Sequence, residues 1–179
     1  MTEMVILVDP HDREIGIEEK IKAHRDGKLH RAFSVFVFNE KGEVLLQQRA
    51  FNKYHSGGLW TNACCSHPRP GEAIEQAAGR RLQEEMGFAC QLHRAFQFIY
   101  KAELDGGLIE HELDHVFIGT YSGAVHPDAS EVADFRWHNV QAIKHDLKHS
   151  LAKYTVWFKL AFERALSFVA TNGSLPTSF

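Results

Sequence analysis

Alternating apolar and polar positions predict a chain of short strands and amphipathic helices. Runs of strand length predict strands at Met4–Val8, Ala32–Phe38, Val44–Gln48, Leu59–Cys65, Phe96–Tyr100 and His111–Tyr121. The polar stretch from Asn39 to Gly42 predicts a hairpin turn between the second and third of them.

Helical periodicity marks three further segments. Glu72–Met86 is followed by Gly87, the residue that helix C-termini favour. Within Ser150–Val169, one apolar stripe consists of Trp157, Leu160, Ala161, Ala165 and Phe168. A short helix over Glu18–Arg25 is expected to stop before Gly27. The order of strands, helix, strands and helix predicts an α+β fold with helices packed on a mixed, mostly antiparallel sheet.

Composition narrows the class of protein. A length of 179 residues with 44% hydrophobic content fits a single domain over 1–179. The net charge of -3 comes from basic and acidic residues spread along the chain, which argues against nucleic-acid binding. No apolar run approaches about 18 residues and the N-terminus lacks a signal pattern, so we expect a soluble cytoplasmic protein without a membrane partner. Three cysteines suit free thiols in a reducing compartment. A monomer and a small homo-oligomer both remain open.

The segment Trp60–Pro68 places a thiol beside an imidazole. On a strand that ends at Pro68, Cys65 and His67 share one face, while Cys64 and Ser66 take the other. Cys65 is then presented together with an imidazole, and Cys64 belongs to the core. Two small buried hydrophobic residues are an equally compatible interpretation of the two cysteines when this segment is taken alone.

Acidic residues alternate between Leu108 and Phe117. Glu110, Glu112 and Asp114 fall on one strand face, where carboxylates repel one another unless a cation neutralises them or water screens them. A solvent-facing edge strand and a metal site are therefore both open. Three imidazoles, from His24, His30 and His67, could join Glu110 and Glu112. Such a set suits an octahedral or five-coordinate Mn²⁺, Mg²⁺ or Zn²⁺ better than a closed tetrahedral zinc.

The helix at 72–86 carries a charged pattern with two interpretations. Arg81 and Glu85 are four residues apart, which by itself indicates a surface ion pair worth about 0.2–0.5 kcal/mol. The helix also resembles the Nudix box, whose glutamates hold Mg²⁺ against a diphosphate, through Glu72, Arg80, Leu82, Glu84, Glu85 and Gly87. Ser66 stands where the box opens with glycine, and Arg81 replaces the glutamate that follows the box arginine. Nudix hydrolases bind metal with that glutamate, so its loss argues against hydrolysis and leaves diphosphate binding open.

Basic residues on four predicted elements suit a diphosphate bridged by Mg²⁺: Lys20, Arg49, Lys53 and Arg81. Taken singly, each is more simply a solvated surface charge. Jointly, the motifs resemble the type I isopentenyl diphosphate isomerases, a Nudix-fold family that interconverts isopentenyl and dimethylallyl diphosphate. The resemblance spans roughly Lys20 to Phe158 and rests on Glu19–His24, Leu29–Ser34, Gln48–Ala50, Trp60–Asn62, Cys65–Pro68, Tyr100, Glu110–Glu112 and Trp157.

The resemblance implies a role for each candidate residue. Cys65 and Glu112 would be the catalytic pair on opposite faces of the substrate alkene, with Tyr100 assisting proton transfer beside Glu112. Trp157, which periodicity alone assigns to the core, would stand over the reacting carbon. One divalent metal would be bound by His24, His30, His67, Glu110 and Glu112. Glu85 would help to hold a second ion, Mg²⁺, on the diphosphate.

The implied chemistry suits these residue types. Protonation of an alkene creates a tertiary carbocation, which an indole face stabilises by about 2 kcal/mol or more in a dry site. Removal of a neighbouring proton completes the isomerisation, so one acid and one base are needed. Which of Cys65 and Glu112 donates the proton stays open. A Nudix hydrolase and a non-catalytic diphosphate-binding module are the alternative functions.

Overall fold

The computed structural model describes residues 2–172. Its strands are β1 Met4–Val8, β2 Glu14–Glu19, β3 His30–Phe38, β4 Val44–Arg49, β5 Trp60–Thr61, β6 Cys64–Ser66, β7 Leu92–Glu103, β8 Ile109–Thr120 and β9 Val132–His138. Its α-helices are α1 Lys20–Asp26, α2 Ile74–Met86, α3 Val140–His149 and α4 Val156–Asn172, with short 3-10 turns at Asp105–Gly107 and Leu151–Lys153. No helix within residues 2–172 is long and apolar enough to cross a membrane.

The strands form one mixed sheet with β3 at its centre. β3 pairs in parallel with β8 and antiparallel with β1, β4 and β6, and the remaining pairings are antiparallel. β8 therefore lies between β3 and β7, so the interpretation of its acidic face as a solvent-facing edge is wrong. The α+β expectation with a mostly antiparallel sheet is confirmed.

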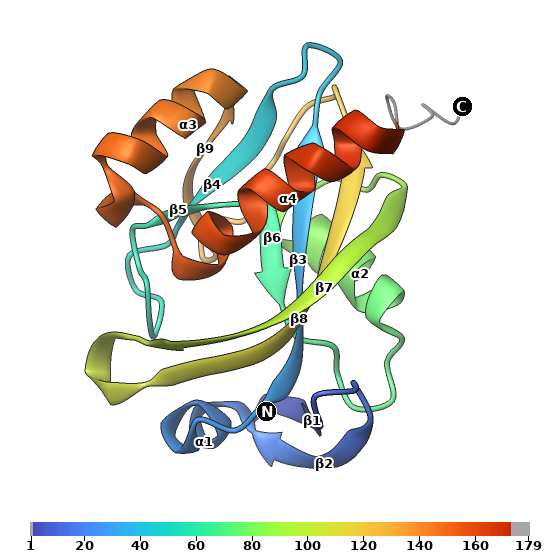
Figure 1. The fold of residues 1–179 in the computed structure, drawn as a ribbon, viewed down its shortest axis with the longest axis vertical. Helices are drawn as coiled ribbons and strands as arrows, with labels where there is room; N and C mark the ends of the chain where they lie inside the picture. Colours follow the sequence, from blue (N-terminus) through green and yellow to red (C-terminus); the bar gives the residue numbers. More distant parts are fainter. Residues whose placement is uncertain (1, 173–179) are drawn as a thin grey trace.

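Side chains on the two faces of the sheet build two apolar layers. Phe33, Val35 and Val37 of β3 pack with α2, whereas Phe36 and Phe38 pack with α3 and α4. Figure 1 shows α4 crossing one face of the sheet in front, with α2 behind it. The alternation along β3 thus places an apolar layer on each side, and the sheet is held between helices.

The ends of two helices follow their local sequence. Glu19 caps α1 by accepting hydrogen bonds from the backbone N–H groups of Ile21 and Lys22, and α1 ends at Gly27 with φ of 61°. Gly87 ends α2 with φ of 76°, and a Cβ there would lie 2.2 Å from the carbonyl oxygen of His126. Only glycine fits this position without a shift of the backbone. The hairpin turn at Asn39–Gly42 is also confirmed.

Three predicted elements are wrong in extent. The strand over Phe96–Tyr100 is longer than predicted and runs over Leu92–Glu103. The single strand over Leu59–Cys65 is two short strands, because the Asn62 side-chain amide donates to the carbonyl oxygens of Val35 and Cys64 and the chain changes partner there. The helix over Ser150–Val169 begins at Val156, after Thr155 has bonded to the backbone of Trp60. Three elements were missed by the sequence pattern: β2, β9 and α3.

Candidate active site

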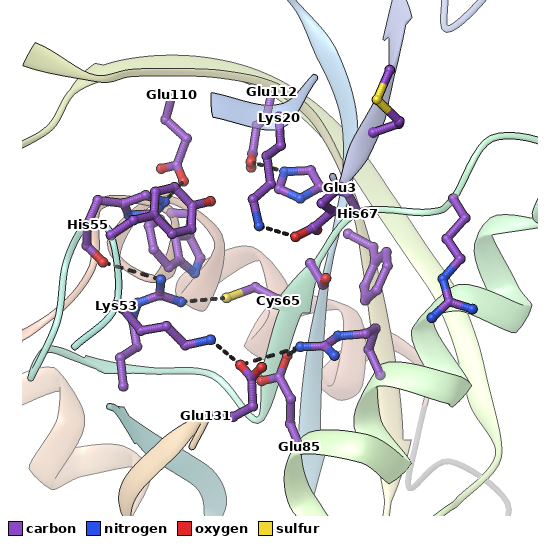
Figure 2. Close-up of a pocket in the computed structure, with 18 of the residues that line it drawn as sticks. Glu3, Lys20, Lys53, His55, Cys65, His67, Glu85, Glu110, Glu112 and Glu131 are labelled. Carbon is purple, nitrogen blue, oxygen red and sulfur yellow. Dashed lines mark hydrogen bonds and ion pairs between the residues drawn. The ribbon is translucent and has the colours of Figure 1, made fainter. Parts of the chain in front are cut away.

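One cavity of about 690 Å³ opens at the end of the sheet where β3, β6 and β8 meet α2. Its walls contain most of the predicted site residues: Lys20, Arg49, Lys53, Cys65, His67, Arg81, Glu85, Glu110, Glu112 and Trp157. In Figure 2, Cys65 lies between Glu112 and His67 on one side and Glu85 and Glu131 on the other. The structure thus brings together residues from separate segments of the chain.

The two adjacent cysteines have different surroundings. Cys64 is fully buried in the apolar layer under α2, whereas Cys65 lines the cavity. Ser66 lines the cavity as well, so the predicted alternation holds for the cysteines and His67 but not for Ser66. Burial raises the pKa of the Cys65 thiol, although Arg49 Nη1 lies 3.9 Å from its sulfur and opposes that effect. The protonated thiol is therefore the stable form.

The acidic face of β8 is buried. Glu110 is 3% exposed, Glu112 7% and Asp114 1%. Burial and the neighbouring Glu112 charge raise the pKa of Glu110 well above its usual range. Burial also works against ionisation of Glu112, but the imidazoles of His30 and His67 hold its pKa well below the usual value. Asp114 accepts a hydrogen bond from Ser34 Oγ at 2.8 Å, and burial raises its pKa to about 8.

Tyr100 lies behind the cavity wall. Its hydroxyl donates to Glu112 Oε2 at 2.7 Å, and its ring is buried. Tyr100 is not among the residues that line the cavity. Its contact with the cavity wall is therefore the hydrogen bond to Glu112.

The imidazoles near Glu112 are oriented by the backbone. Nδ1 of His24 lies 2.7 Å from the carbonyl oxygen of Lys20, and Nδ1 of His30 lies 2.9 Å from that of Lys28. Because a carbonyl can only accept, each Nδ1 carries the hydrogen and each Nε2 presents a lone pair. Both Nε2 atoms are buried without a hydrogen-bond partner.

These lone pairs fit a divalent metal ion. His24, His30, His67 and Glu112 each offer one ligand atom, and these atoms lie within 4.8 Å of one another. His30 Nε2 is 3.5 Å from Glu112 Oε1, so with a neutral imidazole two electron-rich atoms face each other in a buried place unless a proton or a metal ion lies between them. A cation between them removes the repulsion and satisfies both. Glu110 falls in a second group, with His24 and His55.

Glu85 and the basic residues line another side of the cavity. Glu85 is buried, accepts hydrogen bonds from Arg81 Nη2 at 2.7 Å and Gln47 Nε2 at 3.0 Å, and burial raises its pKa. The predicted surface pair of Arg81 and Glu85 is therefore a partly buried one. Lys20 pairs with Glu3, and Lys53 pairs with Glu131.

The Trp157 side chain is buried in the core and also lines the cavity. Its side chain is 3% exposed, and its Nε1 is buried without a hydrogen-bond partner. The Arg49 guanidinium lies 5.4 Å from the indole ring, so a cation already faces this ring. Of the predicted stripe on α4, Trp157, Ala161 and Ala165 are buried, whereas Leu160 is 49% exposed, which makes its assignment to the core wrong.

Comparison with known proteins assigns the fold and the family. The model of the NUDIX domain family matches residues 28–158. An isopentenyl-diphosphate Delta-isomerase of Burkholderia multivorans is 53% identical over 165 residues, covering 92% of this chain and 94% of that protein. One from Photorhabdus laumondii is 53% identical over 159 residues, covering 89% and 90%. The chain belongs to the isopentenyl-diphosphate Delta-isomerase family.

Solved structures of other proteins share its fold. The protein DR0079 from Deinococcus radiodurans superimposes with a TM-score of 0.75 at 15% identity, covering 90% of this chain and 98% of that one. The MutT protein from Methanosarcina mazei gives 0.64 at 20% identity, covering 80% and 95%. The Nudix fold expected from the altered box is confirmed.

Sequence reasoning missed several cavity residues, among them Glu3, His55 and Glu131. Glu3 and Glu131 are the partners of predicted substrate-binding lysines. Burial lowers the pKa of His55 to about 3 and that of His24 to about 4, so both imidazoles are neutral near pH 7. The one available signal for His55 was its place in the segment Lys53–Gly58, between a predicted diphosphate ligand and two glycines.

Proposed function

We propose that this isomerase-family protein interconverts isopentenyl diphosphate and dimethylallyl diphosphate, with Cys65 and Glu112 as the proton-transfer pair. The observation that carries the proposal is the cavity itself, which holds a protonated thiol, an ionised carboxylate and an indole beside four basic side chains. Relatives that bear this activity in their names, at 53% identity, support it.

The diphosphate is bound by Lys20, Arg49, Lys53 and Arg81. All four line the cavity, and they come from α1, β4, the following loop and α2. Lys20 and Lys53 are each paired with a carboxylate in the free protein. Substrate phosphate oxygens take over those charge-assisted hydrogen bonds, so binding exchanges one anion for another rather than desolvating a free ammonium group.

The isomerisation needs one proton added and one removed. A proton is donated to the terminal alkene carbon, which leaves a tertiary cation, and a second group takes a proton from the adjacent carbon to form the new double bond. No electron is gained or lost. Cys65 and Glu112 hold one proton between them, on sulfur in the free protein, and exchange the roles of acid and base when the reaction runs backwards.

Trp157 stabilises the cation. Its indole lies in the cavity wall and is shielded from water, and in such surroundings the attraction between a cation and an indole face reaches about 2 kcal/mol. Water would capture the cation and give an alcohol, so exclusion of water protects the product. Tyr100 positions Glu112 through its 2.7 Å hydrogen bond.

A divalent ion completes the site. His24, His30, His67 and Glu112 would hold it together with Glu110, and Mn²⁺, Mg²⁺ and Zn²⁺ are the candidate ions. Once bound, it supplies a fixed positive charge that sets the proton affinity of Glu112. Glu85, which accepts hydrogen bonds from Arg81 and Gln47 in the free protein, would help to hold Mg²⁺ on the diphosphate.

The competing function is hydrolysis of a diphosphate. Arg81 stands in place of a metal-binding glutamate and donates to both Glu84 and Glu85. Arg81 therefore places a positive charge where Nudix hydrolases place a negatively charged metal ligand. The geometry therefore favours diphosphate binding without cleavage.

Turnover of isopentenyl diphosphate with Mg²⁺ and Mn²⁺, followed by proton NMR of the alkene region, tests the proposal. We expect the allylic isomer to appear without release of inorganic phosphate. Phosphate release from this substrate or from a nucleoside diphosphate panel, with no isomer formed, would favour the hydrolase instead. Tight diphosphate binding with neither product would favour a binding module. The cytoplasmic location and a monomeric or small homo-oligomeric state stay predictions.

A further inference from the structure

His55 is a buried imidazole that lies next to the metal ligands. It follows β4 in a loop that lines the cavity, and it is 4% exposed. Its Nε2 is 3.5 Å from Glu110 Oε1, and its ring stacks on that of His24 with centroids 5.8 Å apart. Figure 2 shows His55 beside Glu110 at one side of the cavity. This distance between His55 Nε2 and Glu110 Oε1 is longer than the roughly 2.7–3.2 Å of a typical N–H···O hydrogen bond.

His24, His55 and Glu110 form a second set of candidate ligands. Their ligand atoms lie within 4.8 Å of one another. Two polar atoms of these residues, His24 Nε2 and Glu110 Oε2, are buried without any hydrogen-bond partner. Nδ1 of His55 faces Ser56 Oγ at 3.2 Å, which leaves Nε2 directed at Glu110. Unsatisfied buried lone pairs cost about 1–3 kcal/mol each unless something binds them.

His24 belongs to both ligand sets, which limits the number of ions. Its Nδ1 is committed to the backbone, so only Nε2 is free, and one imidazole nitrogen ligates one ion. The two sets therefore describe one centre that His24 joins. Ligand atoms on opposite sides of an ion with bonds of about 2.1 Å are about 4.2 Å apart, which is close to the 4.8 Å limit within which the atoms of each set lie.

We propose that His55 is a ligand of this metal centre, through Nε2, and that its imidazole biases the centre toward Zn²⁺ or Co²⁺ over Mg²⁺. The proposal rests on the metal site of the proposed function and adds a fourth imidazole to it. Imidazole nitrogen suits zinc and other late transition metals, whereas Mg²⁺ prefers oxygen donors. The competing role is that of a positioning residue, in which His55 only orients Glu110 by hydrogen bonding.

His55→Gln separates the two roles, because a glutamine amide can still donate to Glu110 but supplies no imidazole nitrogen. The exposed His126, which lies outside both ligand sets, gives the matched control His126→Gln. Metal-free parent and variants are titrated with Co²⁺ and Mg²⁺ against a competing chelator. Imidazole nitrogens bound to Mn²⁺ are counted by pulsed electron paramagnetic resonance. Thermal unfolding checks the fold, and His55→Asn replaces His55→Gln if the latter does not fold.

We expect His55→Gln to lose one nitrogen from the count and to weaken Co²⁺ binding about tenfold or more, with Mg²⁺ affinity nearly unchanged. His126→Gln should match the parent in both measurements. An equal nitrogen count in parent and His55→Gln, or equal loss of Co²⁺ and Mg²⁺ affinity, would overturn the proposal. A parent that shows four nitrogens but no isomerisation would refute the proposed function and leave the ligand role of His55 intact.

Discussion

At the scale of single residues, Cys64 and Cys65 are adjacent in sequence but differ in exposure to the cavity. We predict that Cys65→Ser lowers kcat by about 10²–10⁴-fold, the usual contribution of a general acid or base, because a hydroxyl gives up and takes a proton less readily than a thiol. Cys64→Ala is the matched control and should retain kcat while losing some thermal stability. Steady-state kinetics and melting temperatures of both variants provide the check. Retained kcat in Cys65→Ser would remove sulfur from the mechanism.

Tyr100 is a residue whose effect passes through its neighbour. Tyr100→Phe removes the 2.7 Å hydrogen bond to Glu112, and such bonds to charged groups contribute about 1.5–3 kcal/mol. We expect kcat to fall about tenfold or more with KM nearly constant, and the acidic limb of the pH profile to move to higher pH. Tyr121→Phe, whose hydroxyl binds a surface carbonyl, is the control. An unshifted pH profile would leave Tyr100 with a structural role only.

Some site residues could be predicted from the sequence because local alternation already separates them. The two-residue period of a strand places Cys65 and Cys64 on opposite faces, and it does the same for Glu112 and His111. Glu3, His55 and Glu131 could not be found this way, because their partners Lys20, Glu110 and Lys53 are brought to them only by the tertiary fold. A charged residue that belongs to no local sequence pattern cannot be assigned to a site until the fold shows which residue it contacts.

At the scale of elements, α2 carries a carboxylate within its buried stripe. Glu85 shares that stripe with Ala78, Leu82 and Met86, and Arg81 is its charged partner. Arg81→Ala leaves Glu85 buried without this cation. We expect a loss of about 1–3 kcal/mol in the free energy of unfolding, and a higher KM because a diphosphate ligand is gone.

Arg80 provides the comparison on the same helix. Its partners Glu72 and Glu84 are more exposed than Glu85, so Arg80→Ala should cost about 1 kcal/mol or less. Denaturant unfolding of the two variants checks the difference. Equal losses from Arg80→Ala and Arg81→Ala would contradict the buried position of the Arg81–Glu85 pair.

The elements predicted best are those whose period is uninterrupted. β1 has the predicted bounds, and β3, β4 and α2 keep one pattern from end to end and differ from prediction by at most two residues at one end. The Leu59–Cys65 segment failed because the side chain of Asn62 replaces backbone pairing in its middle. β2 was missed because it carries few apolar residues, and both of its isoleucines are exposed.

At the scale of the whole molecule, the buried imidazoles link stability to pH. Burial lowers the pKa of His24 to about 4 and that of His55 to about 3. The unfolded chain, with imidazole pKa values near 6.5, therefore takes up these protons first as the pH falls. The free energy of unfolding is then highest above about pH 6.5 and declines toward about pH 4, by at most about 1.4 kcal/mol per pH unit for each histidine.

Denaturant unfolding of the metal-free protein across this range measures that slope. His24→Gln should flatten it, because glutamine does not titrate. A parent whose stability is constant from about pH 7 to pH 5 would contradict the neutral, buried state of these imidazoles. Added divalent metal should raise stability most above about pH 6.5, where the ligands are free of protons.

The central claim is that Cys65 and Glu112 move protons to and from the substrate inside the cavity. Isomerisation of isopentenyl diphosphate in deuterium oxide, with NMR of the allylic product, tests it most directly. The donated hydrogen comes from a protein group that exchanges with solvent between turnovers. We therefore predict that the parent forms a product with deuterium in a methyl group and that Cys65→Ala forms no product. Product without deuterium in the parent, or unchanged turnover in Cys65→Ala, would contradict the account.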